Sequence, residues 1–398
     1  MTLELNQLSD QVQALSATAA ERLASLERQR PAAEARLRAI GLADDELQGK
    51  VRAALRYRWA GAIPAAEPVD AAFPCPPHPA RANVLAADGS QVYPDRHGVA
   101  LYYLINVGSI AFRHGSGEAP RVASRPAVFY EDADLYEEEG RQKPVEKIDA
   151  ERDRRELGEL ARLAAANADA PAVALLDNGL LLYFSLQAQD RAEIKRELAP
   201  YLAHLSALRD SGAAVAGIVD RPRAAGVARL LHLHTLPMEA LKDHADLFQQ
   251  DADFRHLTDG ALFADRLQPG ERSALFENGS PANLDHFQPA GHSVFFFYLN
   301  PGPAGRHALL RVEVPEWVAH DPARLDLVHA ALVEQCRATG GFPYVLMRAH
   351  ELAVVTVAER RELEQMVVAA LVRRGLSLSV SHKAQGKAWT GAGRRRYP

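Results

Sequence analysis

The sequence predicts an α/β protein with a five-stranded mixed sheet flanked by helices, an N-terminal helical arm and a loop-rich insertion. Short apolar runs typical of buried strands alternate with longer stretches of helical periodicity. Their order is two or three strands, a helix, a strand, a helix, a strand and a helix. An apolar fraction of 47% supports a globular protein, and 398 residues suffice for one large core with insertions or for two lobes.

Residues 1–80 are expected to form the helical arm and a connector. Apolar residues recur at alternating spacings of three and four from Leu5 to Leu26, which indicates a helix with a coiled-coil-like seam. A second helix is expected at about residues 32–57, after Pro31. Repeated prolines between residues 64 and 79 then indicate an irregular connector.

The main domain is expected over residues 81–380. Strand-like segments in it are residues 83–87, 99–112, 126–131, 172–176, 180–184 and 214–219. Helical segments are residues 145–167, 190–211, 324–339 and 358–374. Weak periodicity with frequent Gly, Pro, Asp and His predicts the loop-rich insertion at about residues 238–305. Residues 381–398 contain five basic residues and no acid, which predicts a flexible basic tail.

Composition narrows the class of protein. With 46 basic and 51 acidic residues the net charge is −5, so any contact with DNA must come from local patches. Two cysteines, Cys75 and Cys336, are too few for a disulfide framework or a zinc-thiolate cluster. The N-terminus lacks the features of a signal peptide, and no apolar run approaches eighteen residues, so we expect a cytoplasmic protein without membrane contact.

Three aspartates, Asp88, Asp177 and Asp220, each follow a short apolar run. If these runs are neighbouring strands, their carboxylates gather at one edge of the sheet. Crowded carboxylates repel one another unless cations bind between them, and Mg²⁺ or Mn²⁺ prefers oxygen ligands. Two such ions can stabilise the attacking and leaving oxygens of a phosphodiester. Taken singly, Asp-Gly-Ser and Asp-Asn-Gly are ordinary turn sequences, so the argument rests on their combination.

A helix with two glutamates, Glu156 and Glu159, falls between the antiparallel strands and the strand that precedes Asp177. This is the order in which a ribonuclease H-like site is assembled. The glutamates lie three residues apart on one helical face, so position alone does not choose between them. Asp220 is either a fourth carboxylate or, through Pro222, the cap of the next helix.

A rival metal site begins at His232 and His234, which would lie on one face of a strand and could bind zinc or iron. The nearby His244 and His256 lack a recognisable ligand spacing. A transition-metal hydrolase or oxygenase is therefore the weaker hypothesis.

Five motifs taken in order resemble the NurA nucleases, which pair with the HerA translocase in processing DNA ends. The motifs are Ala87-Asp88-Gly89-Ser90, Leu175-Leu176-Asp177, Val219-Asp220-Arg221-Pro222-Arg223, Gly341-Phe342-Pro343-Tyr344 and Ala349-His350-Glu351-Leu352. The resemblance covers roughly residues 80–376 and implies a ribonuclease H-like fold. It also implies exonuclease action on single strands and DNA ends, and endonuclease action on single-stranded DNA as a further activity.

Transferred residue by residue, the resemblance makes Asp88 the first metal ligand and Asp177 the second acid. Glu159 looks like the helix carboxylate, with Glu156 as the alternative. His350, which on its own would more often be a surface or packed histidine, resembles a late histidine that binds metal or orients a phosphate, with Tyr344 beside it. The family has Asp-Gly-Ser at the second acid, whereas Asn178 follows Asp177 here, so the conformation of this turn is open.

The predicted reaction is hydrolysis of DNA phosphodiesters assisted by two Mn²⁺ or Mg²⁺ ions, in DNA end resection and double-strand break repair. Expected partners are single- and double-stranded DNA, a second copy of the chain and a HerA-like hexameric ATPase, since the chain has no Gly-Lys-Ser/Thr loop of its own. The basic residues expected to contact DNA are Arg221, Arg223, Lys383, Lys387, Arg394, Arg395 and Arg396.

The alternative function is a non-catalytic subunit that keeps the fold and organises a DNA-processing complex. The altered turn after Asp177 favours it, and retention of all the acids argues against it. The N-terminal seam through Leu8, Val12 and Leu15 could pair two copies, dock on the ATPase or pack back on its own domain.

Overall fold

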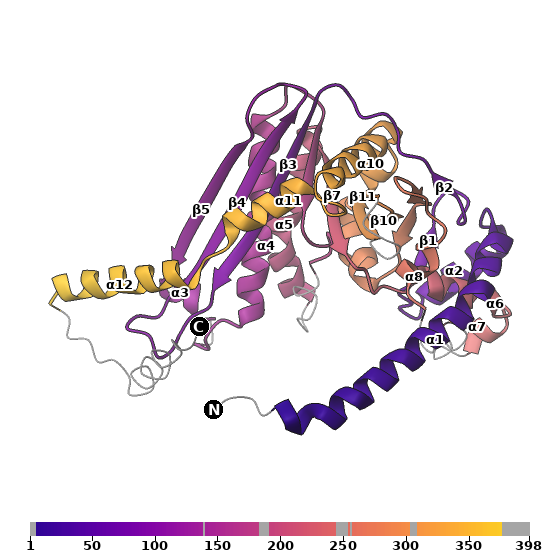
Figure 1. Ribbon diagram of the computed structural model, residues 1–398, viewed down its shortest axis with the longest axis horizontal. Coiled ribbons are helices and arrows are strands. Elements are labelled where there is room, and N and C mark those ends of the chain that lie inside the picture. Colours follow the sequence, from indigo (N-terminus) through magenta and orange to yellow (C-terminus); the bar gives the residue numbers. More distant parts are fainter. Residues whose placement is uncertain are drawn as a thin grey trace.

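A mixed sheet flanked by helices forms the centre of the computed structural model, which describes residues 5–137, 140–182, 191–243, 254, 257–302 and 309–375 (Figure 1). Five of its strands lie in the order β5-β4-β3-β6-β7. Their bounds are β3 Ala82–Val92, β4 Tyr103–His114, β5 Arg121–Phe129, β6 Ala172–Leu176 and β7 Ala214–Asp220. The first three run antiparallel, and β6 and β7 continue parallel to β3. This order is that of a ribonuclease H-like sheet and confirms the predicted fold class.

Two long helices connect the parallel strands. α4 (Val145–Ala166) leads from β5 to β6, and α5 (Arg191–Asp210) leads from β6 to β7. Both lie within about one residue of their predicted bounds, because their apolar residues repeat with helical periodicity. They cover one face of the sheet (Figure 1). The strand-like segment after Asp177 was wrongly predicted, since residues 180–182 form no strand and residues 183–184 lie outside the described chain.

The predicted loop-rich insertion, residues 238–305, contributes strands to the sheet. Beyond β7 the sheet continues through β11 (Leu310–Pro315), β10 (Val294–Leu299), β9 (Phe276–Asn278) and β1 (Ala62–Pro64). With β2 (Ala72–Phe73) and β8 (Arg272–Ser273), it has eleven strands within the described residues, more than the five predicted. All six residues of β10 are buried, as in a strand that is covered on both faces, and its apolar run was included in the predicted insertion because the surrounding segment is rich in Gly, Pro and His.

Most of the remaining helices follow β7 in the chain. Towards the extension lie α6 (Gly226–Thr235), α7 (Ala240–Asp243), α8 (Asp259–Phe263) and the short helical turns η4 (Asn283–Phe287) and η5 (Gln288–Ala290). The late helices are α9 (Glu316–Ala319), α10 (Pro322–Arg337), α11 (Tyr344–Ala353) and α12 (Val357–Arg373), and a short α3 (Asp132–Leu135) follows β5. α11 packs against β3 and β4 on the face opposite α4 (Figure 1). Among the described helices, none is both long and apolar enough to cross a membrane.

The N-terminal arm does not break at Pro31. After the turn η1 (Leu5–Leu8), α1 runs without interruption from Ser9 to Ile40. An interior proline costs a helix about 3 kcal/mol, which burial of Ala33 and Leu37 just beyond it helps to offset. The break comes instead at Gly41, whose φ of 54° ends α1, and α2 (Asp45–Leu55) follows.

The predicted seam on α1 is exposed. Val12 is 57% and Leu15 is 69% exposed, so this part of the helix does not pack back on its own domain. In Figure 1 the N-terminal half of α1 extends away from the sheet.

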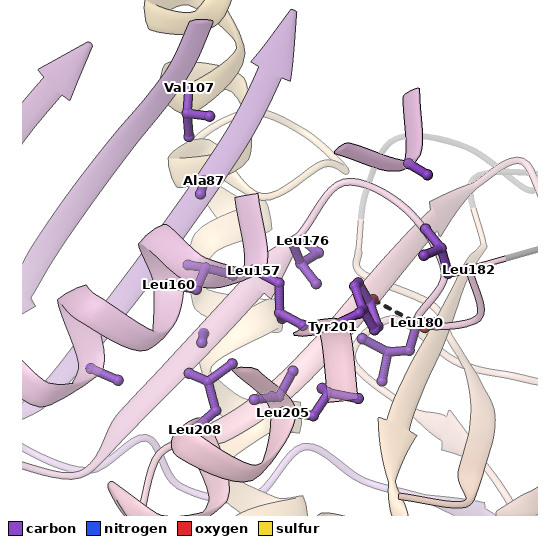
Figure 2. Packing of buried hydrophobic residues seen from close by; sticks show 14 of the residues in the cluster. Ala87, Val107, Leu157, Leu160, Leu176, Leu180, Leu182, Tyr201, Leu205 and Leu208 are labelled. Carbon is purple, nitrogen blue, oxygen red and sulfur yellow. Dashed lines mark hydrogen bonds between the residues drawn. The ribbon is translucent and has the colours of Figure 1, made fainter. Parts of the chain in front are cut away.

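Three buried clusters stabilise these layers. Along β3 the side chains alternate, so that Leu85 and Ala87 face α4 and α5 while Val84 and Ala86 face α10 and α11. Figure 2 shows part of the first cluster, in which Leu157 of α4 and Leu205 of α5 pack near Leu176. The third cluster lies between the sheet extension and helices α1, α2, α6 and α8.

Candidate active site

The strand register brings Asp88 and Asp177 side by side. Ala87 of β3 pairs with Leu176 of the parallel strand β6, so the next residue on each strand is an aspartate at the same level. β6 ends there, as predicted. β3 does not, because it continues antiparallel to β4 as far as Val92, and Asp88 therefore lies inside a strand rather than at its end.

His350 of α11 lies directly against Asp88. Its Nδ1 is 2.7 Å from Asp88 Oδ2, and 63% of the His350 side chain is exposed. The sheet fixes the end of this helix, because Asn106 Nδ2 donates to Leu352 O (3.1 Å) and Ala353 O (2.9 Å). Tyr344 begins the same helix and packs towards the buried cluster around α10. It lies six residues before His350, about 9 Å along the helix axis.

Glu156 is the helix carboxylate that reaches this place. It is 3% exposed, and a Cβ built on Gly89 would lie 2.6 Å from its Oε1, so the carboxylate lies directly over the residue after Asp88. Arg152 Nε lies 3.2 Å from the same oxygen. Burial raises the pKa of Glu156 well above its usual range, and the charges of Asp153, Asp88 and Asp177 raise it further.

Glu159 lies one helical turn away in a different environment. Ser109 Oγ donates to it at 2.8 Å, Arg125 Nε at 3.1 Å and Arg162 Nε at 2.8 Å. Although burial raises its pKa, the hydrogen bonds from Arg162, Ser109 and Arg125 outweigh that effect, and the pKa of Glu159 is lowered. The structure therefore brings Glu156 to the aspartates and Glu159 to an arginine cluster.

The carboxylates at this edge repel one another. Burial and the charges of Asp88 and Asp220 raise the pKa of Asp177 to about 6, while His350 opposes the shift. Burial likewise raises the pKa of Asp153, with Asp88 adding to it. Asp153 was not predicted as a site residue, although its place three residues before Glu156 puts it on the same helical face.

The donor set suits a divalent cation. Among the described residues, no lysine or arginine forms an ion pair with Asp88 or Asp177, so their charge is left to other cations. Apart from His350, the acidic neighbours Asp88, Asp177 and Glu156 offer carboxylate oxygens, which Mg²⁺ and Mn²⁺ prefer, with water filling further positions. In the described part of the chain, no three such side chains already converge as the ligands of one ion.

A cavity of about 730 Å³ opens beside these carboxylates. Asp153, Glu156 and Asn178 are among the residues that line it. Its basic lining residues are Arg152, Arg223, Arg229 and Arg311. Arg223, predicted to contact phosphate, is thus part of the cavity, whereas Arg221 is 88% exposed outside it.

Asp220 ends β7 at the same edge and is 53% exposed. The prediction that it caps the next helix is wrong. α6 begins six residues later, and its first N–H groups, of Val227 and Ala228, donate to the buried Asp259. The charge of Asp220 is one of the causes that raise the pKa of Asp177.

The rival metal site is not formed as predicted. His232 and His234 lie in α6 rather than on a strand, and residues two apart in a helix do not share a face. His244 and His256, and the tail residues Lys383, Lys387, Arg394, Arg395 and Arg396, lie outside the described residues.

Comparison with known proteins assigns the chain to a family. Solved structures that resemble it include the NurA nuclease of Sulfolobus solfataricus, which is 14% identical, with 73% of this chain and 85% of that chain covered and a TM-score of 0.46. A NurA bound to dAMP and manganese is 10% identical, with coverages of 93% and 98% and a TM-score of 0.37. The catalytic domain of human endonuclease V is 15% identical, with coverages of 81% and 98% and a TM-score of 0.32.

These structural similarities are too low to bear on the site, and the curated proteins gave no match. The sequence itself, however, matches the NurA domain over residues 82–355, which is more than half of the chain, and the protein therefore belongs to the NurA family.

Proposed function

We propose that this protein is a metal-dependent deoxyribonuclease that hydrolyses DNA phosphodiesters. The observation that carries the proposal is the gathering of Asp88, Asp177 and Glu156 beside a ribonuclease H-like sheet, where Arg152 pairs with Glu156 and, among the described residues, no lysine or arginine pairs with either aspartate. Membership of the NurA family supports it.

Asp88, Asp177 and Glu156 would hold Mn²⁺ or Mg²⁺, in two positions as phosphodiester hydrolysis favours. Bound there, the divalent cations lower the pKa of a water molecule and stabilise the charge on the phosphate. Asp220, at the end of β7, would add a further carboxylate at the exposed side. Glu159 takes no part in this set, because its oxygens are engaged by Ser109, Arg125 and Arg162.

The chain's own groups would bind and orient the substrate. The Asp88 carboxylate would accept from the His350 Nδ1–H, which fixes the ring, and in the imidazolium form the Nε2–H would donate to a phosphate oxygen. Arg152 and Arg223 line the adjacent cavity and would contact phosphates of the strand that enters it. We expect exonuclease action on single strands and DNA ends, with endonuclease action on single-stranded DNA as a further activity.

We propose a HerA-like hexameric ATPase as partner and a homodimer as the working unit, in DNA end resection and double-strand break repair. The exposed seam on α1, including Val12 and Leu15, offers an apolar face for such a contact. A translocating partner would also supply the long-range delivery of DNA that a net charge of −5 does not favour.

The test is cleavage of end-labelled single- and double-stranded DNA by the full chain with Mn²⁺, Mg²⁺ or chelator. Glu156→Gln and Glu159→Gln form a matched pair on the same helix. We expect Glu156→Gln to lose at least 100-fold in rate and Glu159→Gln to stay within a few-fold of wild type. Absence of cleavage with every metal would favour the non-catalytic subunit, and equal losses in the two variants would contradict the proposed ligand set.

A further inference from the structure

The bend after Asp177 lies directly across strand β7. Residues 178–180 cover Gly217, where a Cβ would come within 2.4 Å of Asn178 O and 3.1 Å of Leu180 N. Such contacts are far below van der Waals distance, so a side chain at position 217 would displace the bend. Because only two residues separate Leu180 from Asp177, a displaced bend would also move the Asp177 carboxylate.

Both backbone polar groups of Leu180 are held by side chains from other elements. Its N–H donates to Glu313 Oε2 at 2.9 Å, and its carbonyl accepts from the Tyr201 hydroxyl at 3.0 Å. Figure 2 shows Tyr201 beside Leu180, with this second hydrogen bond dashed. Glu313 is 4% and Tyr201 is 3% exposed, so water does not compete for these bonds. The bend is therefore clamped from β11 on one side and from α5 on the other.

Glu313 is itself held in place by a buried network. Arg311 donates to Glu313 Oε1 from Nε at 2.9 Å and stacks on the Phe296 ring, 3.6 Å from its centroid. Arg311 also lies 3.4 Å from the hydroxyl of Tyr298, which donates to Asp259 at 2.9 Å. One oxygen of Glu313 thus binds Arg311 while the other is left to accept from Leu180.

We propose that Glu313 is a positioning residue for Asp177, acting through Leu180 together with Tyr201. This inference rests on the proposed function, since it concerns the metal affinity of that same site. Groups that orient the ligands of a metal typically contribute 10- to 100-fold in metal affinity or activity. Loss of the hydrogen bonds that hold Leu180 should therefore weaken metal binding measurably.

The variants that test this are Glu313→Gln and Tyr201→Phe in the full chain. Leu180 and Arg311 donate to different oxygens of Glu313, and in glutamine one of these two positions becomes an NH2 group that faces a donor, although the size of the side chain is kept. Tyr201→Phe removes only the hydroxyl that binds the Leu180 carbonyl. Tyr298→Phe is the matched control, because it breaks the same network beyond Arg311 and leaves both bonds to Leu180 in place.

Mn²⁺ binding is measured by titrating the metal-free protein and following the electron paramagnetic resonance signal of free Mn²⁺, with melting temperatures recorded for each variant. We expect about 10- to 100-fold weaker binding in Glu313→Gln and several-fold weaker binding in Tyr201→Phe. Tyr298→Phe should lower the melting temperature and leave Mn²⁺ affinity within twofold of wild type.

Wild-type affinity in both Glu313→Gln and Tyr201→Phe would overturn the positioning role while leaving the nuclease assignment intact. The positioning role would also be overturned if Tyr298→Phe weakened Mn²⁺ binding as much as Glu313→Gln does. The loss of Mn²⁺ affinity would then follow from lower protein stability alone. If Glu313→Gln fails to fold, the Mn²⁺ affinity of Tyr201→Phe alone tests the positioning role. A wild-type protein that binds no Mn²⁺ would overturn the proposed function and this inference together.

Discussion

Removing the charge of Asp177 should stabilise the metal-free protein at neutral pH. Its pKa is raised from an ordinary value of 3.8 to about 6 by burial and by the charges of Asp88 and Asp220. The folded protein binds this proton more tightly than the unfolded chain does. The contribution of the Asp177 carboxyl group to folding stability is therefore complete below about pH 4 and is lost as the pH rises through about 6. Asp177→Asn removes this loss and keeps the size of the side chain.

The size of the effect follows from the two pKa values. A change from 3.8 to about 6 corresponds to about 3 kcal/mol between the protonated and ionised forms. Asp177 is partly exposed, and solvent screening reduces this to about 1 to 2 kcal/mol. The variant should therefore exceed wild type by that amount at pH 8 and equal it near pH 4.

The assay is urea unfolding in chelator at several values between pH 4 and 8. Asp326→Asn, at an exposed aspartate of α10, serves as control and should leave the pH dependence unchanged. Adding Mn²⁺ should reverse the order of wild type and Asp177→Asn, because a ligand that binds only the folded wild type stabilises it. A variant less stable than wild type at pH 8 without metal would refute the view that Asp177 lies in a repulsive cluster.

Three further predictions concern cleavage, DNA binding and partnership. Asp88→Asn should abolish cleavage of end-labelled DNA and leave affinity for single strands within a few-fold of wild type; cleavage at a near wild-type rate would exclude Asp88 as a ligand. Deleting residues 381–398 removes five basic residues, so the plot of log affinity against log salt should become shallower, and an unchanged slope would exclude the tail as a DNA contact. A cognate HerA-like ATPase should co-elute with the full chain at micromolar concentration and accelerate duplex degradation with ATP; separate elution and an unchanged rate would contradict the partnership.

The ribonuclease H-like part of the fold was predictable because the apolar residues of its helices and strands follow the regular spacing of those elements. α4 and α5 show helical spacing, and β6 is an uninterrupted apolar run of the predicted length. β10 and β11 were missed for two different reasons. β10 follows a segment rich in Gly and Pro, so its apolar run was included in the predicted insertion. β11 contains Arg311 and Glu313, two charged residues that would be expected to face solvent but are buried as an ion pair.

The site was predictable only in part, because sequence order does not specify side-chain contacts. The order of Asp88 and Asp177 was enough to expect them together. The choice between Glu156 and Glu159 depends on which of them meets Gly89 and which meets Arg162, and both lie on one helical face. Glu313, more than a hundred residues beyond Asp177, gave no signal, since its role depends on the pairing of β11 with β7.

The continuity of the sheet bears on how the protein can be shortened. A minimal version made by cutting out residues 226–315 would keep every proposed metal ligand, yet it would leave β7 with a free edge of unpaired N–H and C=O groups where β11 now pairs. Such an edge is a template for intermolecular β-pairing and aggregation. Any compact derivative therefore has to replace β11 with another strand or retain the extension whole.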